Sequence, residues 1–299
     1  KESLYITVKA ARVVAVVVEV AGLDGVRFGV AGRPFVITLS ASQIQSFDTS
    51  EPFGCERRWF FQHVMQVPYE TPSYMLAGTA LHKVIEDYLI TGVVPDADDS
   101  TLALFDAMKL EVDRVKEEGF LALEKWVSFN LTPTIKINGK IDVVRDVGPL
   151  DWKTSSNLKY APTPYKLARS TQMVLYSHAL VGGTPKEQTV SHVYVQTKGT
   201  PLVKRVDALL QPSVLTSCMS RIISVAEKME SVSKIQNPDD VAADRTKCKA
   251  GTKLQCSFYH ICKPEKESIM SAVDRLKARL NKMQGGMSGG PIVPNDAPT

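Results

Sequence analysis

The chain of 299 residues lacks the marks of several large protein classes. It has no run of the ~20 apolar residues that a membrane-spanning helix needs, and no secretory signal pattern. We therefore expect a cytoplasmic protein with no membrane partner. It has no Gly-x4-Gly-Lys-Ser/Thr loop, so it carries no P-loop ATPase of its own. Its five cysteines include no close C-x2-C pair, which is the usual spacing of a zinc site.

Composition and charge narrow the class only a little. With 44% apolar and 23% charged residues, the chain has an ordinary globular makeup, long enough for one large core or two smaller ones. The net charge of +4 permits a nucleic-acid partner without indicating one. Residues 245–282 are more basic, with ten Lys or Arg against three acidic residues, which suits either a phosphate backbone or a solvated helix face.

The most informative stretch is a predicted β-hairpin over residues 139–153, with turn-forming residues at 146–149. Alternate side chains of a strand share a face, so Asp151 and Lys153 point the same way, and pairing across the turn brings Asp142 beside Asp151. Two neighbouring carboxylates repel unless a cation lies between them, and a hard divalent metal is the natural occupant. With a lysine to stabilise phosphate charge, the stretch indicates a metal-dependent phosphodiesterase. A solvated strand face with cross-strand ion pairs gives the same pattern.

Other polar side chains stand at helical spacing. His82 and Glu86 lie one turn apart in one predicted helix, and Gln172 and Tyr176 lie one turn apart in a later one. His82 is a candidate metal ligand, although most single helix histidines are surface residues or satisfied core residues. The Gln172 and Tyr176 pair equally suits an ordinary helix surface.

The cysteines give a second signal. Cys248, Cys256 and Cys262 cluster as C-x7-C-x5-C, and cysteine clusters of cytosolic proteins bind metals more often than they form disulfides. A fourth thiolate is needed. Cys55 is a better candidate than Cys218, which lies in an amphipathic helix and suits a buried apolar position. Four thiolates bind zinc or a [4Fe–4S] cluster, and the lack of a close cysteine pair favours iron–sulfur.

The hydrophobic periodicity predicts an α/β domain in which helices flank a short mixed β-sheet. Residues 1–37 are β-rich, and Ser40 or Ser42 suits the N-cap of a first helix. Beside the hairpin, the pattern predicts strands over 190–196 and 202–206, and helices over 78–90, 165–180 and 212–235 with a further helix ending at 118.

Taken in order along the chain, these motifs resemble the PD-(D/E)XK nuclease superfamily. More narrowly, they resemble its RecB-like branch with an iron–sulfur cluster, which includes the AddB nuclease domain and CRISPR-associated adaptation exonucleases. The resemblance spans residues 39–264 and rests on Leu39-Ser-Ala-Ser-Gln-Ile44, Cys55-Glu-Arg-Arg-Trp-Phe-Phe61, Gly78-x3-His82-x3-Glu86, Gly139-Lys-Ile-Asp142, Asp151-Trp-Lys153, Gln172-x3-Tyr176 and the three late cysteines. Each motif is weak alone, but the ordered set is specific.

The resemblance implies a catalytic role for each matched residue of the hairpin and its neighbours. His82, Asp142 and Asp151 would bind Mg²⁺ or Mn²⁺, helped by the backbone carbonyl of Trp152. Lys153 would position the attacking water and stabilise the transition state.

In the helix after the hairpin, the resemblance implies that Gln172 would orient the site, and that Tyr176 would support it or contact DNA.

The resemblance also implies a cluster site. Cys55, Cys248, Cys256 and Cys262 would hold a [4Fe–4S] cluster, with Zn²⁺ as the alternative, and would join the start of the domain to its end. The spacing from Cys248 to Cys256 is wider than is common in this branch.

At the level of the whole chain, the resemblance implies a restriction-endonuclease-like core and a metal-dependent DNA nuclease. We expect an exonuclease on single-stranded DNA or DNA ends, acting in recombination, repair or other DNA processing, with a helicase or another recombination protein as a partner. The alternative is a catalytically silent nucleic-acid-binding module of the same fold within a larger assembly. The expected divisions are a β-rich segment at 1–37, the nuclease domain with its cluster at 38–265, a helix at 266–283 and a disordered tail at 284–299.

Overall fold

The computed structural model describes residues 16–19, 27–30, 36–69, 73–248, 256–262 and 273–278. The chain divides into two compact units, residues 1–37 and residues 38–299. In the first unit, β1 (Val16–Glu19) and β2 (Arg27–Val30) form an antiparallel pair. Of the helix expected at 266–283, the described part, 273–278, is helical, and the expected tail at 284–299 lies outside the described residues.

A six-stranded mixed sheet forms the centre of the second unit. Its order is β3-β5-β6-β7-β8, and β4 pairs with β5. β6 runs parallel to β7, whereas the pairs β4/β5, β5/β6 and β7/β8 are antiparallel. The strands are β3 (Ile37–Leu39), β4 (Ala122–Thr132), β5 (Ile135–Arg145), β6 (Gly148–Ser155), β7 (Gln188–Gln196) and β8 (Val203–Leu210). β4 is not among the strands predicted from the sequence.

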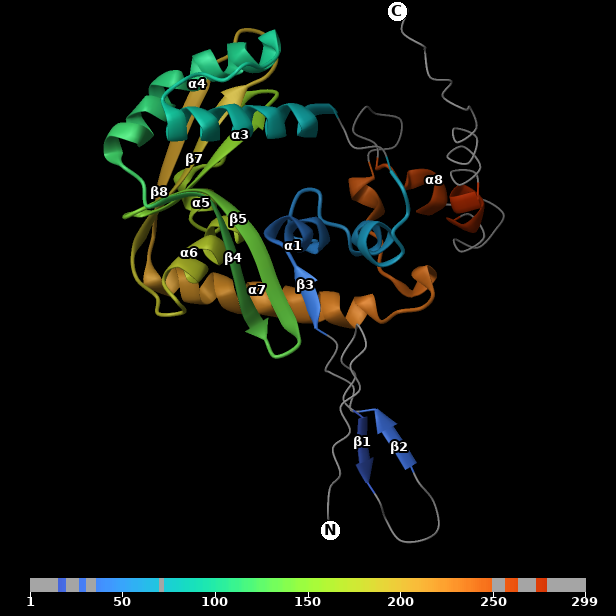
Figure 1. Ribbon diagram of the computed structural model, residues 1–299. Helices are drawn as coiled ribbons and strands as arrows, with labels where there is room; N and C mark the ends of the chain where they lie inside the picture. The colour runs from blue at the N-terminus through green and yellow to red at the C-terminus, as the bar shows by residue number, and fades with distance from the viewer. Residues whose placement is uncertain are drawn as a thin grey trace, which may run out of the picture. The chain divides into compact units, whose positions relative to one another are not determined.

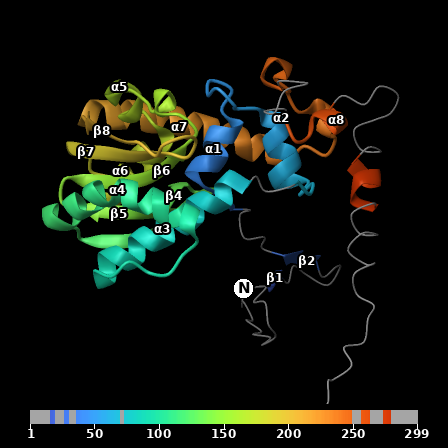
Figure 2. The same ribbon diagram turned by 90° about the horizontal axis from the view of Figure 1, so that it is seen from above.

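Helices cover both faces of this sheet, which confirms the expected α/β fold (Figures 1 and 2). On one face lie α3 (Ser73–Thr91) and α4 (Asp99–Glu118), and on the other α6 (Thr171–Leu180) and α7 (Pro212–Ser233). The shorter helices are α1 (Ala41–Phe47), α2 (Glu56–Trp59), η1 (Phe60–Val64), η2 (Leu158–Tyr160), α5 (Pro164–Leu167), η3 (Pro238–Asp240), η4 (Arg245–Lys247) and α8 (Tyr259–Cys262). In the described part of the chain, no helix combines the length and hydropathy that crossing a bilayer requires.

Short polar residues fix the helix boundaries. Ser40 caps α1: its Oγ accepts from the Gln43 backbone N–H at 3.3 Å, while Gln43 Oε1 accepts from the Ser40 N–H at 3.0 Å. This confirms the predicted cap. The single helix predicted over 165–180 is wrong, because α5 and α6 are separate. Ser170 lies between them with an extended backbone (φ −60°, ψ 129°), which interrupts the helical hydrogen-bond ladder.

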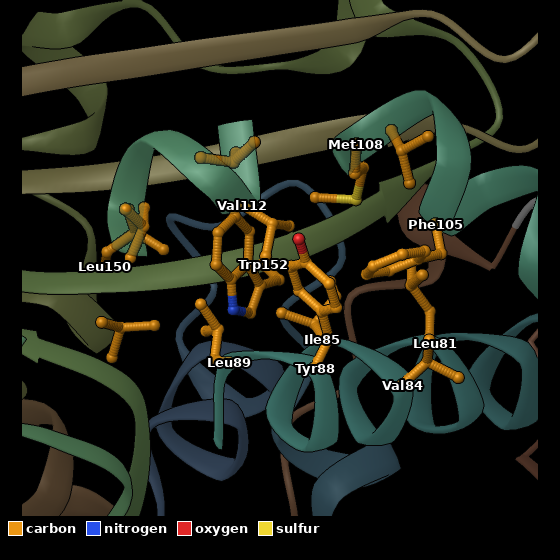
Figure 3. Close-up of a cluster of buried hydrophobic side chains, with 14 residues drawn as sticks. Leu81, Val84, Ile85, Tyr88, Leu89, Phe105, Met108, Val112, Leu150 and Trp152 are labelled. Atoms are coloured by element: carbon orange, nitrogen blue, oxygen red, sulfur yellow. The ribbon is translucent and has the colours of Figure 1, made fainter. Parts of the chain in front are cut away.

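The core between the sheet and α3/α4 sets the direction of the functional strand β6. Trp152 is 2% exposed and belongs to a buried cluster with Ile85 and Leu89 of α3 and Val112 of α4 (Figure 3). Because side chains alternate along a strand, a buried Trp152 places its neighbours in β6 on the opposite face. The apolar cluster therefore lies between the sheet and α3/α4, whereas Asp151 and Lys153 of β6 lie on the face toward α6.

Polar contacts join the start of the second unit to its end. Arg57 donates from Nε to the Val241 carbonyl at 2.8 Å and from Nη2 to the Asp239 carbonyl at 3.0 Å. Lys247 Nζ donates to the Glu51 carbonyl at 2.9 Å. These hydrogen bonds thus join segments nearly two hundred residues apart.

Candidate metal centre

The predicted hairpin is present and orients the first pair of carboxylates. β5 and β6 pair from Arg145↔Gly148 to Val143↔Leu150. Beyond this pairing, a side chain replaces the backbone hydrogen bonds between the strands: Asp142 Oδ2 accepts from the backbone N–H of Trp152 at 2.9 Å. The hairpin therefore holds Asp142 at its open end, next to the residue that follows Asp151.

His82 of α3 approaches the same carboxylate. Its Nδ1 lies 3.3 Å from Asp142 Oδ2, and its ring also hydrogen-bonds the backbone of Trp152. Burial lowers the pKa of His82, which favours the neutral imidazole that can bind a metal. Burial also raises the pKa of Asp142 well above its usual range, and the charge of Asp151 raises it further. The pair is held in a site where a carboxylate is costly without a cation.

Glu124 of β4 is a further acidic residue at this site, and it was not predicted from the sequence. Ligand atoms of His82, Glu124 and Asp142 all lie within 4.8 Å of one another. Glu124 has a left-handed backbone (φ 48°) and forms an ion pair with Lys140 of β5. The side chains of His82, Glu124, Lys140 and Asp142 all line an open pocket of about 300 Å³ beside α3. The nitrogen and oxygen donors fit a hard divalent cation such as Mg²⁺ or Mn²⁺.

A second group of side chains lies on the α6 side of the hairpin. Lys153 Nζ forms an ion pair with Asp151 and donates to Gln172 Oε1 at 2.9 Å. Gln172 Nε2 in turn donates to Asp151 Oδ1 at 2.7 Å and to the Tyr176 hydroxyl at 3.3 Å. Gln172 therefore bridges the lysine and the carboxylate, which fixes the position of the ammonium group.

Tyr176 closes this side of the site. It is 7% exposed, and burial raises its pKa to about 12. A Cβ atom built on Gly139 of β5 would lie 2.8 Å from Tyr176 Cε1, so the strand needs glycine where the ring crosses it. Gly139 thus permits the close approach of α6 to β5.

The four predicted cluster cysteines are all described. The Cys256 backbone N–H donates to the Cys248 carbonyl at 3.0 Å, and Cys55 follows a loop held by its own N–H bond to Ser46 O at 2.8 Å. Burial raises the pKa of the Cys256 thiol, and the neighbouring thiols of Cys248 and Cys55 raise it further. The Cys248 and Cys55 thiols are therefore near enough to Cys256 for their charges to act on its ionisation. Cys262 is buried in α8.

The structure thus brings the predicted site residues into two adjacent groups. His82, Asp142 and the Trp152 backbone form one group, and Asp151, Lys153, Gln172 and Tyr176 form the other. Asp151 links them, since its charge acts on the pKa of both His82 and Asp142. Alternating apolar residues at Leu123, Val127 and Phe129 carried the signal for β4, and hence for Glu124.

Comparison with known proteins places this geometry in a family. A profile of the PD-(D/E)XK nuclease superfamily matches residues 38–263, so the chain belongs to that superfamily. Nucleases of this superfamily use divalent metals, in keeping with the donor set at His82, Glu124 and Asp142. Among proteins with curated function, none matches the chain.

Solved structures similar to this chain include two exonucleases, of which the first is similar in fold. A putative exonuclease from Eubacterium rectale is 12% identical, with a TM-score of 0.50, over 79% of this chain and 92% of that one. LHK-Exo in complex with dAMP is 13% identical, with a TM-score of 0.30, over 66% of this chain and 89% of that one.

Proposed function

We propose that this protein is a metal-dependent DNA nuclease of the RecB-like branch, acting as an exonuclease on single-stranded DNA or DNA ends. One observation carries the proposal: polar side chains from α3, β5, β6 and α6 converge on the open end of a single hairpin. The alternative explanation, ordinary ion pairs on the protein surface, does not account for a buried carboxylate that lies at one hairpin end together with a second carboxylate, a lysine and an imidazole. Hydrolysis of a phosphodiester requires such groups.

The residues divide the chemistry between them. His82, Asp142 and Glu124 would hold Mg²⁺ or Mn²⁺, with Asp151 and the Trp152 carbonyl at the boundary of the site. The metal supplies Lewis-acid polarisation of the phosphate and activation of water. Lys153, fixed by Asp151 and Gln172, presents its ammonium group to the charge that develops on the phosphate. Tyr176 keeps Gln172 in place from the far side.

Cleavage of end-labelled single-stranded DNA with Mg²⁺ or Mn²⁺ tests this function. We expect Asp151→Asn to lower the rate by about a hundredfold or more, the range found when one charge-stabilising group is removed. Asp106→Asn is the matched control, because it makes the same change at an exposed position on α4. A metal-loaded wild type that binds DNA without cutting it would instead identify a catalytically silent binding module.

Metal binding is measured separately from cleavage. Titration with Mn²⁺, followed by calorimetry, should give a site that Asp142→Asn and Glu124→Gln each weaken. Equal Mn²⁺ affinity in wild type and both variants would refute this ligand set.

We further propose that Cys55, Cys248, Cys256 and Cys262 hold a [4Fe–4S] cluster. The effect of the Cys55 and Cys248 thiols on the ionisation of Cys256, together with the Cys256 N–H bond to the Cys248 carbonyl, supports it. An anaerobically purified protein should show a broad absorption band at about 400 nm, as iron–sulfur clusters do and zinc sites do not. Cys248→Ser should abolish the band, whereas Cys218→Ser on α7 should keep it. Bound zinc without iron or sulfide would overturn the assignment.

A further inference from the structure

The ribbon formed by β4 and β5 carries an unusual exposed side chain beside the pocket. The chain has three tryptophans, all within the described residues. Trp59 and Trp152 are each 2% exposed, whereas Trp126 of β4 is 74% exposed. Leaving a large aromatic ring in water sacrifices the burial that normally stabilises it, so a ring that is this exposed suits a contact with a ligand.

The strand register places Trp126 on the pocket side of the ribbon. Trp126 pairs with Lys140, and Asp142 lies two residues further along β5. Lys140 and Asp142 both line the pocket, and side chains opposite one another in a sheet share a face. Two residues of strand span about 7 Å. The indole therefore lies on the same surface as the metal centre, about two strand positions from Asp142.

Polar side chains continue this surface away from the pocket. Beyond Trp126, Ser128 pairs with Asn138, and Asn130 pairs with Lys136. Ser128 Oγ donates to Asn138 Oδ1 at 2.7 Å. The strip therefore offers hydroxyl, amide and ammonium groups in register on both strands, with Trp126 as its aromatic member.

The charge of the ribbon complements a phosphate backbone. Lys136 and Lys140 lie on the face of Trp126, where Lys140 forms an ion pair with Glu124, and the sequence between Lys125 and Lys140 contains no acidic residue. Lysine is depleted at the centres of protein–protein interfaces, whereas an aromatic platform next to basic side chains is the usual surface for single-stranded nucleic acid. Stacking on a flat indole also requires an unpaired base, because the faces of bases in a duplex are already covered.

On the basis of the nuclease function proposed above, we propose that Trp126 stacks on an unpaired base of a DNA strand whose phosphodiester enters the pocket at Asp142. The β4–β5 strip then tracks the strand on the side away from the scissile bond. Trp126 acts as a positioning residue that makes the enzyme prefer single-stranded DNA over blunt duplex.

The test uses the full chain carrying Asp151→Asn, so that bound DNA stays intact. Oligo(dT) and a blunt hairpin duplex are titrated while tryptophan emission is recorded. Because Trp59 and Trp152 are buried, the emission that DNA quenches should come from Trp126. Trp126→Ala should weaken oligo(dT) binding about tenfold, within the range for loss of one stacked base, and should abolish the quenching. Trp126→Phe should restore most of the affinity without the signal. Leu110→Ala, 80% exposed on α4, is the control and should bind like its parent.

Three results would overturn the inference. The first is unchanged oligo(dT) affinity in Trp126→Ala, and the second is equal loss of affinity for oligo(dT) and blunt duplex. The third is a change from dimer to monomer in sedimentation without a change in DNA binding, which would make Trp126 a contact between copies of the chain. Cleavage by the wild type is tested separately. DNA binding with quenching but without cleavage would refute the nuclease function and support the stacking role of Trp126. Cleavage with unchanged DNA binding in Trp126→Ala would support the nuclease function and refute the stacking role.

Discussion

Replacing Gly139 by alanine sets two opposing effects against each other. Gly139 does not have a left-handed backbone, so any residue can adopt its conformation. Substituting glycine in a strand then stabilises the folded chain by about 0.5–1 kcal/mol, because the unfolded chain loses freedom. The new methyl group, however, would lie 2.8 Å from Tyr176 Cε1, and the gap must open by 0.6 Å to reach the 3.4 Å of an ordinary contact (3.4 − 2.8).

The ring has little room to yield. Tyr176 is 7% exposed, and its hydroxyl is hydrogen-bonded to Gln172 and to the Lys140 backbone. Overpacking of this kind costs about 1–3 kcal/mol, which exceeds the entropic gain. We expect Gly139→Ala to lower the free energy of unfolding by about 1 kcal/mol or more. DNA cleavage should fall as well, because the ring displaces Gln172 from Asp151.

Urea denaturation of four proteins checks this reasoning: the wild type, Gly139→Ala, Tyr176→Leu and the double variant. If the ring contact dominates, Gly139→Ala should become neutral or stabilising once Tyr176 is leucine, and the cycle should show a clear coupling energy. A Gly139→Ala protein that is more stable than the wild type, or that loses the same stability in both backgrounds, would refute the argument.

Other substitutions probe the remaining parts of the site. Trp152→Ala should lower the free energy of unfolding by about 3–5 kcal/mol in urea, since it empties the core beside α3; a loss below 1 kcal/mol would contradict the packing described. Gln172→Leu should slow cleavage by about tenfold or more, since hydrogen bonds to two charged groups are lost, while the melting temperature changes little; unchanged kcat would exclude the bridging role. Burial lowers the pKa of His192 from 6.5 to about 4. Unfolded chains take up this proton near pH 6.5 and the folded chain does not, so the free energy of unfolding should fall as pH drops toward 4, by up to about 3 kcal/mol. Urea titrations at several pH values should show this slope, and His192→Gln should flatten it.

Much of the fold was predictable because its signals are local. The hairpin of β5 and β6 depends on turn residues and alternating side chains that lie within fifteen positions of one another. The buried face of α3 follows from the spacing of its apolar residues, and Leu81, Ile85 and Leu89 are buried as expected. The cap at Ser40 is likewise local.

The missed features depend on distant contacts. Glu124 enters the site only because β4 pairs with β5, and strand pairing is not visible in a single segment. The break between α5 and α6 falls at Ser170, whose apolar neighbours continue a helical pattern on both sides. Tertiary contacts then decide the outcome: Gln172 and Tyr176 face β5 and β6 from α6, where Asp151 and Lys153 meet them.

The links between residues 48–57 and 221–247 affect how the chain acquires its structure during synthesis. Arg57 pairs with Val241, which follows 184 positions later, and Lys247 pairs with Glu51 across 196 positions. At typical elongation rates, a ribosome needs roughly 10–40 s to cover that interval. Throughout this time Glu56 and Asp48, buried in the finished fold, have neither Lys228 nor Arg221 to neutralise them. The first helices of the domain therefore stay without these partners, and accessible to chaperones, until the last helices leave the ribosome.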